Sequence, residues 1–386
     1  MNRAVVVDCC RTPIGRAHPE RGIYRDVRSD DLAVEVVKAL IERNGIDAEL
    51  IEDVVMGNTQ QQGEQGFDVA RTIALMAGLP THTGGTTVNR LCGSSLQALN
   101  QACHSILASC EDVQIVGGLE HMHHVPMDKD IDLNPKLFHR TSKGAMLMGI
   151  TAEFLAQTYG ISREEQDEFA LRSHQLAAKA ADAGEFDREI VPVWGRDEEG
   201  NRYLVHRDQC IREDTDLGQL AALKPAFMPG MGTVTAGNSS PLNDGASAML
   251  VMSEGKAKEL GLKPLVRVVS TAVVGVDPCV MGSGPVPATL KALERAGLSM
   301  ADVDLIELNE AFAAQAIACI RMLEVDPDKV NVRGGAIAIG HPLGASGARI
   351  ATTLINNMVD RNLKYGLATM CIGVGQGIAT IFELAA

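Results

Sequence analysis

The chain has 386 residues, of which 46% are hydrophobic and 22% charged, and its formal net charge at pH 7 is −14. This composition is typical of a folded globular protein and excludes a largely disordered chain. The acidic balance, without any basic block or stripe, excludes the usual nucleic-acid-binding classes, and no apolar run is long enough to span a bilayer.

The first 120 residues alternate between short apolar runs and amphipathic stretches, which is typical of α/β proteins. Residues 30–44 begin with an Asp cap and carry apolar side chains at helical spacing, so they predict a helix. A second helix is predicted from about residue 93 to residue 110. Strands or extended segments are predicted at residues 3–8, 51–56, 86–89 and 113–116.

From about residue 120 to residue 245 the pattern changes to irregular loops and charged helices. Residues 121–141 mix His, Pro, Met, Lys and Asp, which predicts a loop. The run Ser162-Arg163-Glu164-Glu165 is a capping box that opens a charged helix, and residues 197–200 predict a hairpin tip. We interpret this stretch as a loop domain inserted into an N-terminal half that covers residues 1–262.

The alternation of strands and helices resumes in a C-terminal half that covers residues 263–386. Val88-Asn89-Arg90 precedes one helix, and Val330-Asn331-Val332-Arg333 precedes another in a similar way. We interpret this likeness as a weak internal duplication, with chance similarity between strand–helix units as the alternative. Helices are predicted at 287–296, after Asn309 and at 348–359, and strands at 266–270, 303–307, 330–332, 367–371 and 378–383.

Nine cysteines are spread along the chain without a C-x-x-C pair, so neither a zinc ribbon nor a disulfide framework is predicted. The apolar run at residues 1–8 is too short for a signal peptide. These features predict a reducing, cytoplasmic compartment. The cluster of His121, His123 and His124 lacks a carboxylate or cysteine that completes a metal site, so we expect a loop role for it and no metal.

Cys92 lies at the junction between an extended segment and a helix, in the run Asn89-Arg90-Leu91-Cys92-Gly93-Ser94-Ser95. A helix N-terminus offers free N–H groups and positive dipole character, which favour a thiolate. The small residues that follow leave space for a substrate carbonyl. The sequence therefore indicates a candidate nucleophile, and a buried inert cysteine is the alternative.

His341 lies in a loop that contains five glycines between residues 334 and 347. Such a loop lets the backbone approach a ligand closely, and a histidine there can act as a base toward a cysteine or donate to an oxyanion. A phosphate-binding loop is the alternative, but the G-x-x-x-x-G-K-[ST] spacing is missing.

Cys371 precedes a run of alternating glycines, Gly373, Gly375 and Gly377. A dinucleotide-binding loop requires a helix after such a run, whereas the next residues have a strand pattern, so this interpretation is excluded. Asn309 follows a predicted strand. It can orient a water molecule or donate to developing negative charge, and a helix N-cap is the alternative.

Together, the blocks around Cys92, Asn309, His341 and Cys371 resemble the four catalytic blocks of the thiolase family, in the family's order. Residues 232–238 and 243–246 also look like a thiolase signature, and the resemblance covers essentially the whole chain. Within the family, residues 120–127 and 370–380 resemble the thiolase subunit of the bacterial fatty acid oxidation complex.

One departure from the family's biosynthetic branch bears on the substrate. Short-chain acetoacetyl-CoA thiolases typically carry a His-Met-Gly stretch in the insertion, where this chain has Leu147-Met148-Gly149. Loss of the imidazole makes the pocket more apolar, which suits longer acyl chains.

The resemblance implies an α/β thiolase fold. Two similar βαβαβαββ halves, each with a five-stranded mixed sheet, would form a five-layer αβαβα sandwich with their central helices between the sheets. The inserted loop domain would cover coenzyme A. Thiolases are dimers or tetramers, so at least a homodimer is expected, and a heterotetramer with the hydratase–dehydrogenase subunit is the partner complex that the resemblance suggests.

The resemblance also implies a ping-pong cleavage of 3-ketoacyl-CoA by coenzyme A, with coenzyme A as a substrate and no permanently bound cofactor. A ketoacyl synthase, a biosynthetic acetoacetyl-CoA thiolase and a non-catalytic lipid carrier are the alternatives. A ketoacyl synthase would use a second histidine where this chain has a cysteine.

The expected roles of the site residues are Cys92 as nucleophile, His341 as base, Cys371 as acid and base, Asn309 as holder of a water, the Gly373 N–H as oxyanion donor and Ser240 as a coenzyme A contact.

Overall fold

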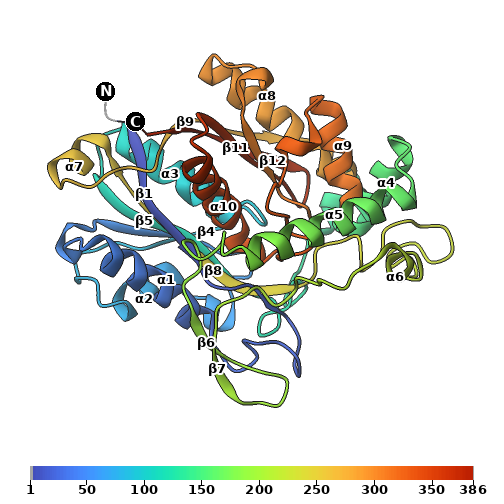
Figure 1. The fold of residues 1–386 in the computed structure, drawn as a ribbon, viewed down its shortest axis with the longest axis horizontal. Coiled ribbons are helices and arrows are strands. Elements are labelled where there is room, and N and C mark those ends of the chain that lie inside the picture. The colour runs from blue at the N-terminus through green and yellow to red at the C-terminus, as the bar shows by residue number, and fades with distance from the viewer. Residues whose placement is uncertain (1–2, 386) are drawn as a thin grey trace.

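The computed structural model describes residues 3–385 and contains one large mixed β-sheet with helices on both faces (Figure 1). Its strands follow the order β10-β11-β12-β9-β1-β8-β5-β3-β4, and the short β2 (Gly15–Arg16) pairs with β8. The strands of the N-terminal half and those of the C-terminal half occupy opposite ends of this order. The sheet therefore consists of two smaller sheets joined edge to edge.

The N-terminal half contributes five strands to the main order, and almost every residue in the three longest is buried. Two of the long strands, β8 and β5, run antiparallel to each other, while β5, β3 and β4 are parallel. The strands are β1 (Ala4–Arg11), β3 (Asp53–Gly57), β4 (Thr86–Val88), β5 (Val113–His121) and β8 (Asn243–Ser253).

The C-terminal half contributes four strands to the main order and, in place of a fifth, an isolated bridge. Ile306 pairs with Val330 at the position where the sequence predicts a fifth strand. The strand does not continue because Asn331 has a φ of 49°, which turns the chain out of the sheet. The strands are β9 (Val266–Gly275), β10 (Leu305–Leu308), β11 (Tyr365–Ile372) and β12 (Gln376–Leu384).

The two halves meet at a short seam between β1 and β9. Within residues 3–385, two residue pairs form this ladder, Val5 with Arg267 and Val6 with Val266. The prediction of a five-stranded sheet in each half therefore needs two corrections. The C-terminal half has four strands in the main order, and hydrogen bonds across the seam make the two sheets continuous.

The helices form three layers around the two sheets. Helices α3 (Ser94–Leu107) and α10 (Ser346–Arg361) pack against each other in the middle and share one apolar cluster with strands of both halves. They lie side by side in the centre of Figure 1. Thirteen of the sixteen residues of α10 are buried, as expected of a helix that is covered on all sides.

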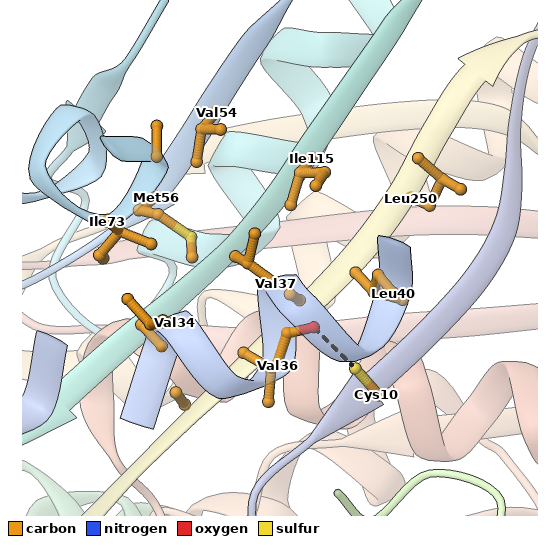
Figure 2. Packing of buried hydrophobic residues seen from close by; sticks show 14 of the residues in the cluster. Cys10, Val34, Val36, Val37, Leu40, Val54, Met56, Ile73, Ile115 and Leu250 are labelled. Atoms are coloured by element: carbon orange, nitrogen blue, oxygen red, sulfur yellow. Dashed lines mark hydrogen bonds between the residues drawn. The ribbon is translucent and has the colours of Figure 1, made fainter. Parts of the chain in front are cut away.

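The outer layers cover the remaining face of each sheet. Helices α1 (Ser29–Asn44) and α2 (Val69–Met76) cover the N-terminal sheet, and α8 (Pro285–Ala296) and α9 (Ala313–Leu323) cover the C-terminal one. Figure 2 shows α1 packed on the sheet, where the Cys10 thiol lies 3.5 Å from the carbonyl oxygen of Val36. The predicted five-layer order is confirmed.

The segment between β5 and β8 carries the remaining long helix and a hairpin. The capping box of Ser162 and Glu165 is present at the start of α5 (Arg163–Asp182), as predicted. The hairpin tip predicted at 197–200 joins β6 (Val193–Arg196) to β7 (Arg202–Val205). The shorter helices of this segment are α4 (Met148–Thr158) and α6 (Leu217–Ala221), and α7 (Glu254–Glu259) follows β8.

The central helix layer predicts a clear difference between two leucine truncations. Leu354 on α10 is fully buried, whereas Leu290 on α8 is 53% exposed. Leu354→Ala is expected to lower the free energy of unfolding by about 3 kcal/mol, through lost burial and a residual cavity. The matched Leu290→Ala should cost under about 0.5 kcal/mol. Denaturant unfolding measures both, and equal costs would contradict the central position of α10.

Candidate active site

Cys92 lies two residues before α3, in the tight turn between β4 and that helix. Leu91 has a φ of 46°, and its N–H donates to the side-chain oxygen of Asn89 at 2.9 Å, which stabilises this turn. A Cβ atom on Gly93 would lie 2.6 Å from the Ile372 side chain. The glycine therefore lets the end of β11 approach the Cys92 turn closely.

The backbone N–H groups of Cys92 and Gly373 both act to lower the pKa of the Cys92 thiol. Burial raises the pKa of the thiol to about 11, and these two N–H groups oppose the rise without cancelling it. The structure thus differs from the expectation that the helix N-terminus favours a thiolate. At neutral pH the resting group is a thiol, so a base must remove its proton.

Cys371 is buried near the end of β11, where it pairs with Gly377 of β12. Burial raises the pKa of its thiol above the ordinary value, and the charge of the neighbouring Cys92 raises it further. The close approach of Gly93 to Ile372, the residue after Cys371, brings the two cysteines to the same place in the fold. The structure therefore brings Cys92, Cys371 and the Gly373 N–H together, although 279 residues separate the two cysteines in the sequence (371 − 92).

The His341 imidazole is held by neighbours on both sides. Its Nδ1 lies 2.6 Å from the Ser346 hydroxyl, and its backbone N–H donates to Asn243 Oδ1 at 2.8 Å. Its Nε2 lies 3.4 Å from the Asn309 amide nitrogen, which can only donate. This network assigns the proton to Nδ1, so Nε2 is unprotonated and accepts from the Asn309 amide.

The His341 imidazole is uncharged at neutral pH. Burial lowers its pKa to about 3, and the positive charge of Arg349 lowers it as well. A neutral imidazole with an unprotonated Nε2 can accept a proton once a donated proton replaces the contact with Asn309. The geometry therefore supports the predicted role of a base.

Asn309 directly follows β10, and its backbone N–H donates to Thr369 O of β11 at 3.1 Å. This bond ties it to the strand that carries Cys371. Helix α9 begins at Ala313 with Phe312 at its N-cap position, so the alternative of Asn309 as a helix N-cap is wrong.

The two central helices connect the Cys92 turn to the His341 loop. The Ala348 N–H of α10 donates to the Ser95 hydroxyl of α3 at 2.8 Å. The Gly344 N–H donates to Glu120 at 2.9 Å, and the charge of Glu120 also acts on the Cys92 thiol. These contacts place the loop that carries the imidazole beside the helix that carries the nucleophile.

Ser240 takes a more distant position than the other predicted site residues. It is half-buried, and its backbone N–H donates to Ala311 O at 3.0 Å, two residues after Asn309. Its role as a coenzyme A contact stays a prediction.

Several residues around the site did not stand out in the sequence. Ser346, Asn243 and Arg349 contact the His341 or Asn309 side chains or backbone. A Cβ atom placed on Gly373 would lie 3.3 Å from the Met148 sulfur. Asn243, Met148 and Ser346 fall in runs that the sequence analysis had singled out, and nothing in the local spacing marks Arg349.

Glu64, His121 and His124 form a compact cluster whose potential ligand atoms all lie within 4.8 Å of one another. The two imidazole rings stack with 3.7 Å between centroids and 12° between planes. Ring nitrogens donate or accept within the protein, with Tyr24 O and Arg25 O among their partners. Glu64 is a carboxylate in this cluster, which corrects the expectation that none completes it. The loop role without a metal stays a prediction.

Comparison with known proteins identifies the family. The model of the thiolase N-terminal domain matches residues 4–255, and that of the thiolase C-terminal domain matches residues 262–384. The chain belongs to the thiolase family. It is therefore a member of an acyltransferase family, as predicted.

Relatives and solved structures agree with this assignment over the full chain. The 3-ketoacyl-CoA thiolase of Aliivibrio fischeri is 56% identical over 387 residues, with 99% of this chain and 100% of that protein covered. The 3-ketoacyl-CoA thiolase of Shewanella loihica is 54% identical over 389 residues, with both chains fully covered.

Two crystal structures are each 40% identical with a TM-score of 0.91, and each covers 100% of this chain and 99% of its own. They are human mitochondrial 3-ketoacyl-CoA thiolase and the acetyl-CoA acetyltransferase of Bacillus anthracis. The predicted thiolase fold is confirmed. Within residues 3–385, the thiolase contains no helix that is long and apolar enough to cross a membrane.

The raised pKa of Cys92 makes a prediction about its alkylation. A higher thiol pKa lowers the thiolate fraction at any given pH, and iodoacetamide reacts with the thiolate. With a pKa of about 11, the alkylation rate of Cys92, followed by peptide mass spectrometry, should still rise between pH 9 and pH 10.

The same chain unfolded in guanidinium provides the reference. Its thiols should level off near the ordinary pKa of about 8.5. A plateau for the folded protein below pH 8 would show that the N–H groups outweigh burial at Cys92.

Proposed function

We propose that this thiolase is a 3-ketoacyl-CoA thiolase of fatty acid β-oxidation. It cleaves 3-ketoacyl-CoA with coenzyme A and releases acetyl-CoA and a shortened acyl-CoA. The observation that carries the proposal is the close approach of the Cys92 turn to the end of β11, where Cys371 lies and where a Cβ atom on Gly93 would meet Ile372. The names of relatives that are 54–56% identical support the degradative substrate over the biosynthetic one.

In the first half-reaction, His341 takes the proton of Cys92 and the thiolate attacks the 3-keto carbon. The N–H groups of Cys92 and Gly373 donate to the oxyanion that forms, and each such donor is worth about 3 to 4 kcal/mol in related acyl transfers. The bond between the α-carbon and the 3-keto carbon then breaks. The shortened acyl group stays on Cys92, and the electron pair leaves with the enolate of acetyl-CoA.

The enolate oxygen is stabilised by His341 and by a water held on Asn309, and Cys371 protonates the carbon. A buried thiol with a raised pKa suits this step, because it holds its proton until a strongly basic carbanion forms. The resulting Cys371 thiolate then takes the proton of incoming coenzyme A. The coenzyme A thiolate attacks the acyl-Cys92 thioester, which regenerates Cys92.

The apolar surroundings of the site support longer acyl chains. Met148 packs in one cluster with Cys371 and Phe312, next to Gly373. Leu147 is exposed at the start of α4, where the biosynthetic branch carries an imidazole. An apolar side chain there favours a hydrocarbon over a polar contact.

A small cavity in the loop region provides the local positive charge that an acidic chain needs to bind coenzyme A. It has a volume of about 150 Å³, and Arg16, Arg212 and Ser239 are among its lining residues. Arg207, five residues before Arg212 in the sequence, forms ion pairs with Asp182 and Glu213 instead. We propose that coenzyme A is bound as a substrate in this region with Ser240 as one contact, and that the enzyme needs no metal or permanent cofactor.

We also propose an oligomeric state, a partner complex and a cellular compartment for this thiolase. The family resemblance supports a homodimer and a heterotetramer with the hydratase–dehydrogenase subunit. Nine free cysteines suit a reducing, cytoplasmic compartment. Co-purification with the second subunit tests the complex.

Thiolysis of a series of 3-ketoacyl-CoA substrates tests the function directly. Loss of the magnesium–enolate absorbance is followed with coenzyme A present and absent, and the acyl-CoA products are identified by mass spectrometry. Turnover that extends to long chains supports the proposal. Turnover of acetoacetyl-CoA alone would indicate the biosynthetic enzyme, and binding without turnover would indicate a carrier.

The two cysteines should fail in different ways. Cys92→Ala removes the nucleophile, so no acyl-enzyme mass should be found after incubation with 3-ketoacyl-CoA. Cys371→Ala keeps the nucleophile but loses the acid and base, so Cys92 should still be acylated while kcat falls by about 100-fold or more. Intact-protein mass spectrometry and steady-state kinetics separate the two, and wild-type kcat in Cys371→Ala would remove that residue from the mechanism.

A further inference from the structure

The first turn of α10 supports both polar side chains of the proposed enolate site. Ser346 holds the Nδ1 side of His341 at 2.6 Å. Three residues later, Arg349 directs Nη2 at Asn309 Oδ1, 3.4 Å away. Residues three apart lie on one face of a helix, so a single helical turn sets the imidazole and the amide relative to each other.

An arginine at position 349 carries a high desolvation cost, because its charge is removed from water. Its side chain is fully buried, and within residues 3–385 its Nε and Nη1 have no hydrogen-bond partner. A buried guanidinium needs compensation from opposite charge. Burial raises the pKa of its neighbour Glu307 to about 8, an effect that Arg349 opposes. Nearby carboxylates favour the charged guanidinium and raise its pKa, namely Glu307, Glu189 and Glu310. The positive charge of Arg11 acts in the opposite direction.

The contact with Arg349 decides which way the Asn309 amide points. A guanidinium only donates hydrogen bonds, so the amide oxygen must face it. A flipped amide would turn its NH₂ group toward Arg349 and its oxygen toward the lone pair of His341 Nε2. Both contacts would then be repulsive, so Arg349 selects the orientation in which Asn309 Nδ2 faces the site.

We propose that Arg349 is a positioning residue of this thiolase, which acts on enolate stabilisation through the orientation of the Asn309 amide. The inference rests on the proposed function, because it assigns Asn309 to the enolate step. It extends that function to a residue that contacts neither sulfur.

Two partial reactions separate this role from a general effect on the fold. Exchange of the acetyl-CoA methyl hydrogens with deuterium from the solvent passes through the enolate and depends on Asn309. Exchange of labelled coenzyme A into acyl-CoA passes through the acyl-Cys92 thioester and needs no enolate. A variant that only damages the fold slows both reactions alike.

Arg349→Lys is the first variant, because it keeps the charge but loses the planar fork of donors. It is expected to slow deuterium exchange by about 10- to 100-fold through misplacement of the amide, and to leave coenzyme A exchange within about 3-fold of wild type.

Two further variants guard against charge and folding effects. The paired change Arg349→Met with Glu307→Gln removes both buried charges, and it should show the same split between the reactions. Loss of the cation leaves His341 neutral at pH 7, because burial is the largest cause of its low pKa. Arg333→Lys is the matched control, since Arg333 is also buried but pairs with Glu185 and Asp360. It should preserve the wild-type ratio of the two rates.

A double-mutant cycle with Asn309→Ala gives the decisive result. If Arg349 acts through Asn309, then Arg349→Lys should cause no further loss of deuterium exchange in the Asn309→Ala background. Additive losses, or equal slowing of both exchange reactions, would overturn the inference. A wild-type enzyme that catalyses neither exchange would instead refute the proposed thiolase reaction itself.

Discussion

The close packing of α3 against α10 between the two sheets is the constraint on which the site depends. Each helix begins at a loop that carries a proposed catalytic side chain, Cys92 before α3 and His341 before α10. The hydrogen bond between Ala348 and Ser95 joins the first turns of the two helices. Because α10 is covered by both sheets, the first turns cannot move apart without exposing the apolar core that the two halves share.

Burial at this position gives the site an uncharged resting state. Desolvation raises the pKa values of the two cysteine thiols and lowers that of His341, so each of the three groups is neutral at pH 7. Charge would then arise only when substrate binds, beside backbone N–H groups that already point at the reacting sulfur. Donors fixed in advance within a medium of low dielectric constant stabilise such charge more strongly than water does.

Elements with a clear local pattern were predictable, and those shaped by distant neighbours were not. The helix at 30–44, the capping box at Ser162 and the hairpin near residue 199 were predicted correctly. The Asp cap expected for that helix was wrong, because α1 begins at Ser29 with Arg28 at its N-cap position. Strand β8 was missed because it begins with Asn243-Asp244-Gly245 and is buried on both faces, so its residues do not alternate. The strand predicted at 330–332 is only a bridge, since Asn331 adopts a left-handed conformation.

The sequence by itself determined the family and indicated the candidate reactive groups, because four motifs in a fixed order specify them without reference to packing. Only the tertiary structure decided how those groups behave. It contradicted the expected thiolate at Cys92, since desolvation depends on atoms from distant parts of the chain. It also identified Ser346 and Arg349 as supports of His341 and Asn309. The contacts of Ser346 and Arg349 depend on which face of α10 is turned toward β10. Packing of distant segments sets this orientation, and no local residue spacing encodes it.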